Sequence, residues 1–208
     1  MERERSTKII AIMALGIAVI GLSVGFASWS ANLDITDSEA SVSKGNNDAE
    51  FKEKLKITAV DCETVEGSGT ATSTGTFTDY NWTGAKISLT KQGDSVTCKA
   101  TVSNESDFKA YFSDITIGSS LECVGEGQNV DAACNALELT VTGQGSGTST
   151  ATAKGTTITN ATDIESNYID TEETGTISFK LEYKDNVISD TDFKVTIPTM
   201  DFDFSTVD

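Results

Sequence analysis

Four cysteines, Cys62, Cys98, Cys123 and Cys134, are the residues of this chain with the most definite chemistry. Zinc sites usually contain two cysteines separated by two other residues, and many also contain histidine. This sequence has neither feature. Thiols of an exported chain normally pair as disulfides. Of the three possible connectivities we favour Cys62 with Cys98 and Cys123 with Cys134, because the second pair closes a short loop. Free thiols and a zinc site are the alternatives.

The absence of histidine also bears on catalysis. Histidine is the side chain most used as a general base near neutral pH, so serine, cysteine and metal-dependent hydrolysis lack their usual central member. The acidic pairs Asp190 with Asp192 and Asp201 with Asp203 could bind Ca²⁺, but the twelve-residue loop pattern is absent and the outward face of a strand explains the spacing. We therefore expect no enzyme, no cofactor, no metal and no catalytic residue.

The net charge of the chain limits the kinds of molecule that it is expected to bind. The chain has 15 Lys and Arg against 32 Asp and Glu, which gives a formal net charge of −17. Nucleic acid and anionic lipid headgroups need clustered basic residues, so an acidic surface repels both. It favours solubility and partners that carry basic patches.

Residues 1–27 have the three parts of a secretory signal, namely a basic head, the uncharged apolar run Ile9 to Ala27, and small residues at the end. Gly25 and Ala27 would occupy the −3 and −1 positions of a cut before Ser28. The apolar run of about 19 residues is also long enough to span a bilayer, so a retained membrane anchor is the alternative.

The segment after the apolar run alternates strictly between apolar and polar residues. In an extended conformation Trp29, Ala31, Leu33 and Ile35 share one face. A free chain end with such a face suits strand addition to an exposed sheet edge, which makes it a candidate donor strand. The alternative is that it forms the first strand of its own domain.

The stretch Val19 to Trp29 resembles the signal-and-cleavage region of the TasA/camelysin family of Gram-positive biofilm-matrix proteins. In that family a small-residue stretch with glycine ends in alanine, and an aromatic residue follows two positions later, as Ala27 and Trp29 do here. Val24-Gly25 stands where the family usually has Gly-Thr. The resemblance implies cleavage by a dedicated signal peptidase, a jelly-roll β-sandwich, and extracellular fibres in which each subunit donates its N-terminal strand to the next. Some relatives have been called metalloproteases, but this sequence has no H-E-x-x-H motif.

The rest of the chain indicates how these segments are positioned. Apolar residues recur at every second position in short runs, which predicts an all-β fold, a single antiparallel β-sandwich of jelly-roll or immunoglobulin-like kind, preceded by an N-terminal hydrophobic signal or anchor helix. We divide the chain into the signal or anchor (1–27), an extended segment and hinge (28–54), and the sandwich domain (55–208). A hairpin is expected around Gln92-Gly93-Asp94, and a register slip at Pro198.

These observations favour a secreted structural subunit of an extracellular or cell-surface fibre of the biofilm-matrix kind. Its expected partners are copies of itself and other matrix or cell-wall components, without nucleic acid, and with membrane contact only through residues 9–27. The alternative is a membrane-anchored adhesin or binding module with a β-sandwich ectodomain, which contacts sugar or protein through Tyr80 and Trp82. Three N-glycosylation sequons, at Asn81, Asn104 and Asn160, fit surface positions.

Overall fold

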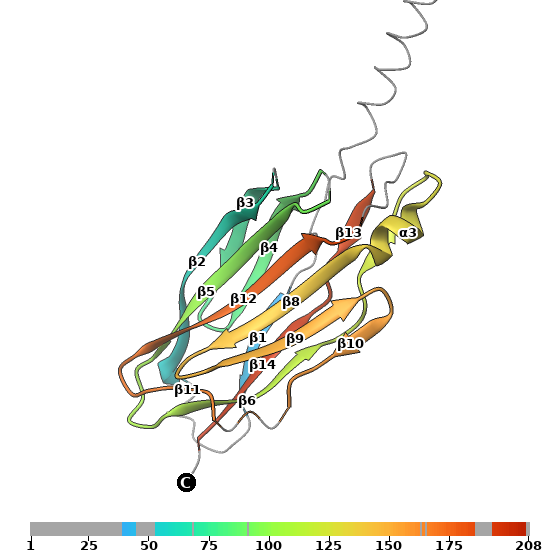
Figure 1. Cartoon of the computed structure of the whole chain (residues 1–208). Coiled ribbons are helices and arrows are strands. Elements are labelled where there is room, and N and C mark those ends of the chain that lie inside the picture. The colour runs from blue at the N-terminus through green and yellow to red at the C-terminus, as the bar shows by residue number, and fades with distance from the viewer. Residues whose placement is uncertain are drawn as a thin grey trace, which may run out of the picture.

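A computed structural model describes residues 39–44, 53–67, 69–90, 92–162, 164, 166–185 and 193–206. Within these ranges the chain forms two six-stranded sheets, a two-stranded ribbon and one short helix. The two large sheets lie one over the other with their strands along the long axis of the molecule (Figure 1). The prediction of an all-β fold is therefore confirmed.

The first sheet has the order β11-β6-β14-β1-β4-β3. Its strands are β11 (Tyr168–Ile169), β6 (Ala110–Ile117), β14 (Met200–Ser205), β1 (Glu39–Lys44), β4 (Asn81–Ser88) and β3 (Thr70–Phe77). Neighbouring strands are antiparallel except for β1, which runs parallel to β14.

The second sheet has the order β10-β9-β8-β12-β5-β2, and every neighbouring pair in it is antiparallel. Its strands are β10 (Thr157–Thr159), β9 (Thr148–Lys154), β8 (Leu137–Gln144), β12 (Thr174–Tyr183), β5 (Ser95–Asn104) and β2 (Leu55–Glu66). The ribbon pairs β13 (Lys194–Thr196) with β7 (Glu122–Val124), and the helix is α3 (Val130–Asn135).

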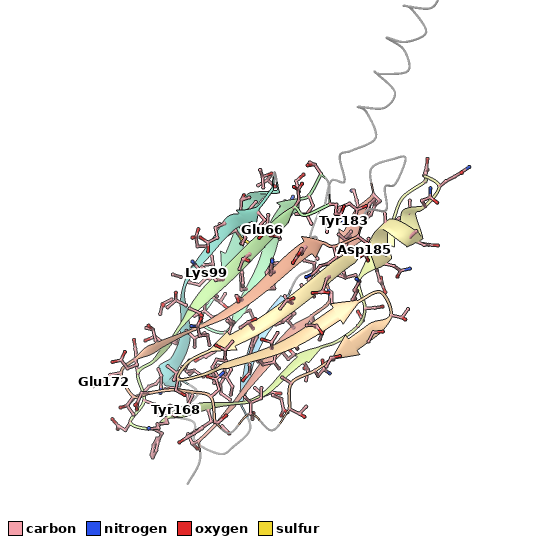
Figure 2. The ribbon with its side chains drawn as sticks, in the orientation of Figure 1. Glu66, Lys99, Tyr168, Glu172, Tyr183 and Asp185 are labelled. Atoms are coloured by element: carbon pink, nitrogen blue, oxygen red, sulfur yellow. A yellow bond between two sulfur atoms is a disulfide. The ribbon has the colours of Figure 1, made fainter. Side chains whose placement is uncertain are left out.

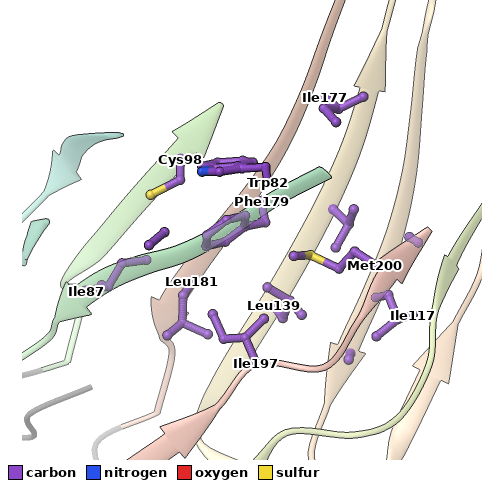
Figure 3. Close-up of a cluster of buried hydrophobic side chains, with 14 of the residues drawn as sticks. Trp82, Ile87, Cys98, Ile117, Leu139, Ile177, Phe179, Leu181, Ile197 and Met200 are labelled. Carbon is purple, nitrogen blue, oxygen red and sulfur yellow. The ribbon is translucent and has the colours of Figure 1, made fainter. Parts of the chain in front are cut away.

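The core fills the space between the two sheets. Long strands such as β5 and β12 contribute every second side chain to it, so even a sequence of modest hydrophobicity can bury one apolar face of such a strand. Trp82 of the first sheet packs against Phe179 of the second with ring centroids 5.3 Å apart. Phe112 and Phe204 meet within the first sheet at 4.4 Å. Figure 3 shows Trp82 directed at Phe179 among side chains from both layers.

The predicted register slip near Pro198 is confirmed. Before the proline, Phe193, Val195 and Ile197 are buried at odd positions, and the chain belongs to the β13–β7 ribbon. After it the buried residues are even, and the chain joins the first sheet as β14. Proline cannot donate to a ladder, so it stands where the chain leaves one sheet for another.

The predicted hairpin around Gln92-Gly93-Asp94 is wrong. The turn carries the chain from β4 in the first sheet to β5 in the second, so the two strands do not pair. Asp94 is fully buried, and one of its carboxylate oxygens accepts hydrogen bonds from the backbone N–H and the hydroxyl of Thr90, each at 2.7 Å. The turn is fastened instead to the end of β12, because the Gly93 N–H donates to the carbonyl of Tyr183.

Candidate functional site

The place of β1 in the first sheet bears most directly on strand donation. β1 lies between β14 and β4, so the ladder holds it from both sides. Ala40 lies opposite Met200 on one side and Trp82 on the other. Residues 39–44 belong to the range 28–54, which the sequence predicts to be an extended segment and hinge, and they form this central strand. Two flanking edges offer backbone hydrogen bonds that hold even a polar segment extended.

The strands on either side of β1 carry large apolar side chains that are buried in the core. Met200, Phe202 and Phe204 of β14 are each at most 1% exposed. On β4, Trp82 is 2% exposed, and its indole N–H donates to the carbonyl of Thr74 at 2.7 Å, which holds the ring in place. Without β1, the backbone edges of β14 and β4 that face each other would be unpaired, and the apolar side chains of these two strands would lose their cover on that side. An extended chain is what such a slot accepts.

β4 bends where it passes the end of β1. Gly75 of β3 and Gly84 of β4 have φ angles of +82° and +76°, and they stand opposite one another in the ladder. A side chain at Gly75 would collide with the backbone of β4, and L-residues rarely adopt such φ values. Along β4 the buried positions change at Gly84 from the even-numbered Trp82 to the odd-numbered Ala85 and Ile87. The break that the sequence suggests at Thr83-Gly84 is thus a kink within one strand.

Several predicted residues lie outside the described part of the chain. They are the cleavage-site residues Gly25, Ala27 and Ser28, the donor-strand residues Trp29, Ala31, Leu33 and Ile35, and the acidic pair Asp190 and Asp192. In the ranges that are described, no helix has the length and apolarity needed to cross a bilayer.

The cysteines pair as the favoured connectivity has them. Cys62 bonds to Cys98, and Cys123 bonds to Cys134. The first disulfide joins directly opposite positions of β2 and β5 with the Cα atoms 4.0 Å apart, so it fastens an edge strand to its neighbour. The second connects β7 to α3 with the Cα atoms 6.0 Å apart. Two disulfides are typical of extracellular proteins.

Cys62 faces inward because of a bulge that sequence reasoning missed. The alternation Leu55-Ile57-Ala59 predicts Ala59 on the buried face. The register of β2 against β5 shifts between Ile57 and Ala59, so Ala59 is exposed and the half-buried Val60 and Cys62 face the core instead. One extra residue in a strand reverses the face of every residue after it.

The aromatic pair suggested for an adhesin does not form a binding surface. Trp82 is buried against Phe179, so its ring cannot reach a ligand, while Tyr80 is only half-buried. An aromatic residue next to a turn can lie on either face of the sheet, and the sequence does not show which. Among the described residues, the large exposed aromatic side chains are Phe77, at 42%, and Phe108, at 50%, and Phe77 lies opposite Trp82 in the β3–β4 ladder. Tyr168 is half-buried. It lies at the opposite end of the sheets from Tyr183 (Figure 2), and its ring packs against Tyr111 at 5.2 Å.

An open pocket of 540 Å³ lies beside the second disulfide. Its lining residues are Cys123, Val124, Gly125, Gly127, Asn129, Val130, Asp131 and Ala132. Asp131 is the single ionisable group among them, because Cys123 is bonded to Cys134. This lining holds no nucleophile beside a base. Elsewhere in the described residues, no three potential ligands of a metal ion come together.

Of the three sequon asparagines, Asn104 does not lie at the predicted surface position. Asn81 and Asn160 are exposed, but Asn104 is fully buried at the end of β5. Its amide nitrogen donates to the carbonyls of Phe108, Ile169 and Asp170, and its amide oxygen accepts from the Ser106 hydroxyl at 2.6 Å and the Ser106 N–H. Its side chain is therefore a structural connection and cannot be a surface modification site.

A second buried asparagine, Asn167, makes a similar connection. Its amide oxygen accepts from the backbone N–H groups of Gly145 and Gly147, both at 3.1 Å, and its amide nitrogen donates to the Gly143 carbonyl. These bonds hold the β8–β9 turn against the segment that leads into β11. The sequence has no distinguishing signal for either residue, because the partners are distant along the chain.

The clearest electrostatic feature is a cluster of charges at the end of β12. Glu182 bonds to Lys180 at 2.8 Å and to Lys184 at 3.3 Å, and Lys184 also reaches Glu138 at 3.4 Å. Burial raises the pKa of Glu182, but the hydrogen bonds and charges of Lys180 and Lys184 outweigh burial and hold that pKa below its ordinary value.

This lowered pKa predicts an acid-dependent term in stability. A carboxylate with a depressed folded-state pKa contributes stability above its unfolded pKa of about 4.3, and this is lost as pH falls through the lower folded value. We expect Glu182→Gln to cost about 0.5–1 kcal/mol at pH 7 and almost nothing below the folded-state pKa, as measured by urea unfolding at each pH. Glu63→Gln, from the more exposed pair with Lys99, is the control and should cost less. A pH-independent cost for Glu182→Gln would contradict this assignment.

Comparison of the chain with protein-family models, with curated protein sequences and with solved structures found no match.

Proposed function

We propose that this protein is a secreted structural subunit of an extracellular or cell-surface fibre, and that it polymerises by donating its N-terminal strand region to the next copy. It performs no catalysis, and its partners are copies of itself. The single observation that carries the proposal is the position of β1. A short segment from the N-terminal region completes the middle of a sheet whose other strands all come from residues 70–205.

The backbone pairing of β1 does not depend on which chain supplies the strand. Ladder bonds join β1 to β14 and β4, and these bonds are the same whether the strand belongs to the same chain or to a neighbour. Exchange of an identical element between copies is a low-cost route to association. Because the donating segment and the accepting slot are different surfaces, the contact is head-to-tail, and such contacts produce open filaments when the rotation does not close.

The fold that accompanies this function is a β-sandwich of the jelly-roll type. Support comes from the connections that pass between the two layers, namely β2 to β3, β4 to β5, and β12 to β14 by way of the ribbon. Residues 1–27 act as the export signal in this proposal. The two disulfides and the charge of −17 suit a soluble protein outside the cell.

The proposal is tested on the full chain, exported from a bacterial host. N-terminal sequencing should give a mature start at Ser28, and sedimentation velocity should show polymers that grow with protein concentration. Adding a peptide of residues 28–44 should occupy free slots and shorten the polymers, whereas a scrambled peptide of the same composition should not.

Two outcomes would refute the proposal. One is a mature protein that stays monomeric at every concentration. The other is polymerisation that proceeds unchanged after residues 28–44 are deleted from a chain that still folds, as judged by near-UV circular dichroism. A monomer that stays in the membrane fraction with residues 9–27 intact would favour the anchored adhesin instead.

A further inference from the structure

β4 extends well beyond its pairing with β1. The paired positions are Asn81, Trp82 and Thr83, whereas β4 continues to Ser88. From Gly84 to Ser88, no strand of the described ranges pairs with β4 on the side where β1 lies. On its other side β4 is paired with β3 up to Ser88. The edge of β4 from Gly84 to Ser88 is therefore where a longer N-terminal strand could continue the pairing.

The register of β1 determines which residues such a strand would bring there. Glu39 is opposite Thr83 and Ala40 is opposite Trp82. Each residue toward the N-terminus of the donor strand therefore lies opposite the next residue toward the C-terminus of β4. An extended strand in this register would place Ile35 opposite Ile87. Two residues further, Leu33 would stand opposite Leu89. Both Ile87 and Leu89 are 1% exposed and belong to the core face. Residues opposite one another in an antiparallel pair share a face, so Leu33 and Ile35 would be added to the core.

A second and independent pattern agrees with this register. At the kink at Gly84 the buried positions of β4 change from even to odd. The N-terminal sequence has the corresponding change, because its apolar residues are odd-numbered up to Ile35 and even-numbered at Ala40 and Val42. The continued register places Ser38, between the two groups, opposite Gly84. A strand with unbroken alternation would instead direct Leu33 and Ile35 away from the core.

We propose that residues 33–38 of a neighbouring copy pair with β4 from Gly84 to Ser88 and with Leu89, the residue that follows it, in the register that continues β1. The donor strand is then one unit of residues 33–44, kinked at Ser38. That the strand comes from a neighbouring copy rests on the proposed function. The pairing register rests on the β1–β4 ladder and does not depend on that function. The occupant is chosen by continuity with the existing β1–β4 ladder and by the match between the two apolar patterns.

The register is tested by cysteine cross-linking in the full chain. Asp34→Cys and Ser88→Cys are placed directly opposite by the register, on the face turned away from the core, whereas Thr36→Cys with Ser88→Cys is displaced by two residues. Directly opposite Cβ atoms lie about 4.5–5.5 Å apart and diagonal ones about 7–8 Å, and a disulfide needs the shorter spacing. Mixing the two single variants and oxidising them should give a 34–88 linked dimer in at least fivefold higher yield than the 36–88 pair. Peptide mapping should show both native disulfides intact.

The outcomes separate this inference from the proposed function. Equal yields from the two pairs, or polymers that form without any 34–88 link, would overturn the register and leave fibre formation standing. In the double variant Asp34→Cys with Ser88→Cys, a link found only within single chains would overturn exchange between copies, and with it the proposed function, while the register would stand.

Discussion

Replacing both Cys62 and Cys98 by alanine is expected to lower the free energy of unfolding by about 4 kcal/mol. The two residues are 36 positions apart in sequence, so their bond removes considerable conformational freedom from the unfolded chain. The bond also fastens β2, an edge strand of the second sheet, to β5. Cys98 is fully buried, and alanine is the replacement that adds no polar group to the core. Urea unfolding of the double variant and the parent protein gives the difference.

The second disulfide provides the matched control. Cys123 and Cys134 are 11 positions apart, so replacing both by alanine should cost about 3 kcal/mol, less than the first pair. The parent protein unfolded under reducing conditions should lose the stability of both bonds. A loss below about 1 kcal/mol for the Cys62–Cys98 variant would show that the bond does not constrain the chain in this way.

Replacing Asn104 by alanine is expected to cost about 2–4 kcal/mol of stability. The substitution leaves three carbonyl oxygens, those of Phe108, Ile169 and Asp170, without their shared donor. It also removes one of the two acceptors near the Ser106 hydroxyl, which leaves the Phe108 carbonyl as the other. Because the site is fully buried, water cannot replace these bonds without a rearrangement of the turn. Urea unfolding measures the loss, and hydrogen exchange should show faster opening where the 104–108 turn meets residues 169–170.

Asn81→Ala is the control for this prediction. It makes the same chemical change at another sequon asparagine, but Asn81 is exposed, so the expected change is within about 0.5 kcal/mol. Equal losses from the two variants would contradict the role assigned to the buried amide. Asn104→Asp, which keeps the shape but removes the donor, should be at least as destabilising as alanine.

The sequence predicts the strands that bury one face in a regular alternation. β12 is such a case, and so is the slip at Pro198, because both depend on local spacing and on the missing N–H of proline. The cysteine pairing is also accessible, since a short loop favours its own closure. The alternation and the slip at Pro198 are determined within a few residues of the chain.

The errors arise where distant segments decide the outcome. The signal for a turn at Gly93 shows that the chain reverses but not which sheet it enters, and the choice depends on a buried contact with β12. The bulge before Ala59 reverses the exposed face without any local glycine or proline to indicate it. β1 is polar and becomes a strand only because β14 and β4 flank it. The predicted donor residues, Trp29 to Ile35, lie outside the described part of the chain, and the place of β1 between β14 and β4 could not be predicted from the sequence.

The parallel alignment of β1 with β14 would set the direction of any fibre built by the proposed donation. A strand can enter the slot in one direction only, so every subunit of a fibre built by donation must point the same way. Such a fibre is polar, and its two ends differ chemically, one ending in an empty slot and the other in an unseated strand. A chain that lacks its N-terminal strand could therefore stop growth at one end and leave the other end free to elongate.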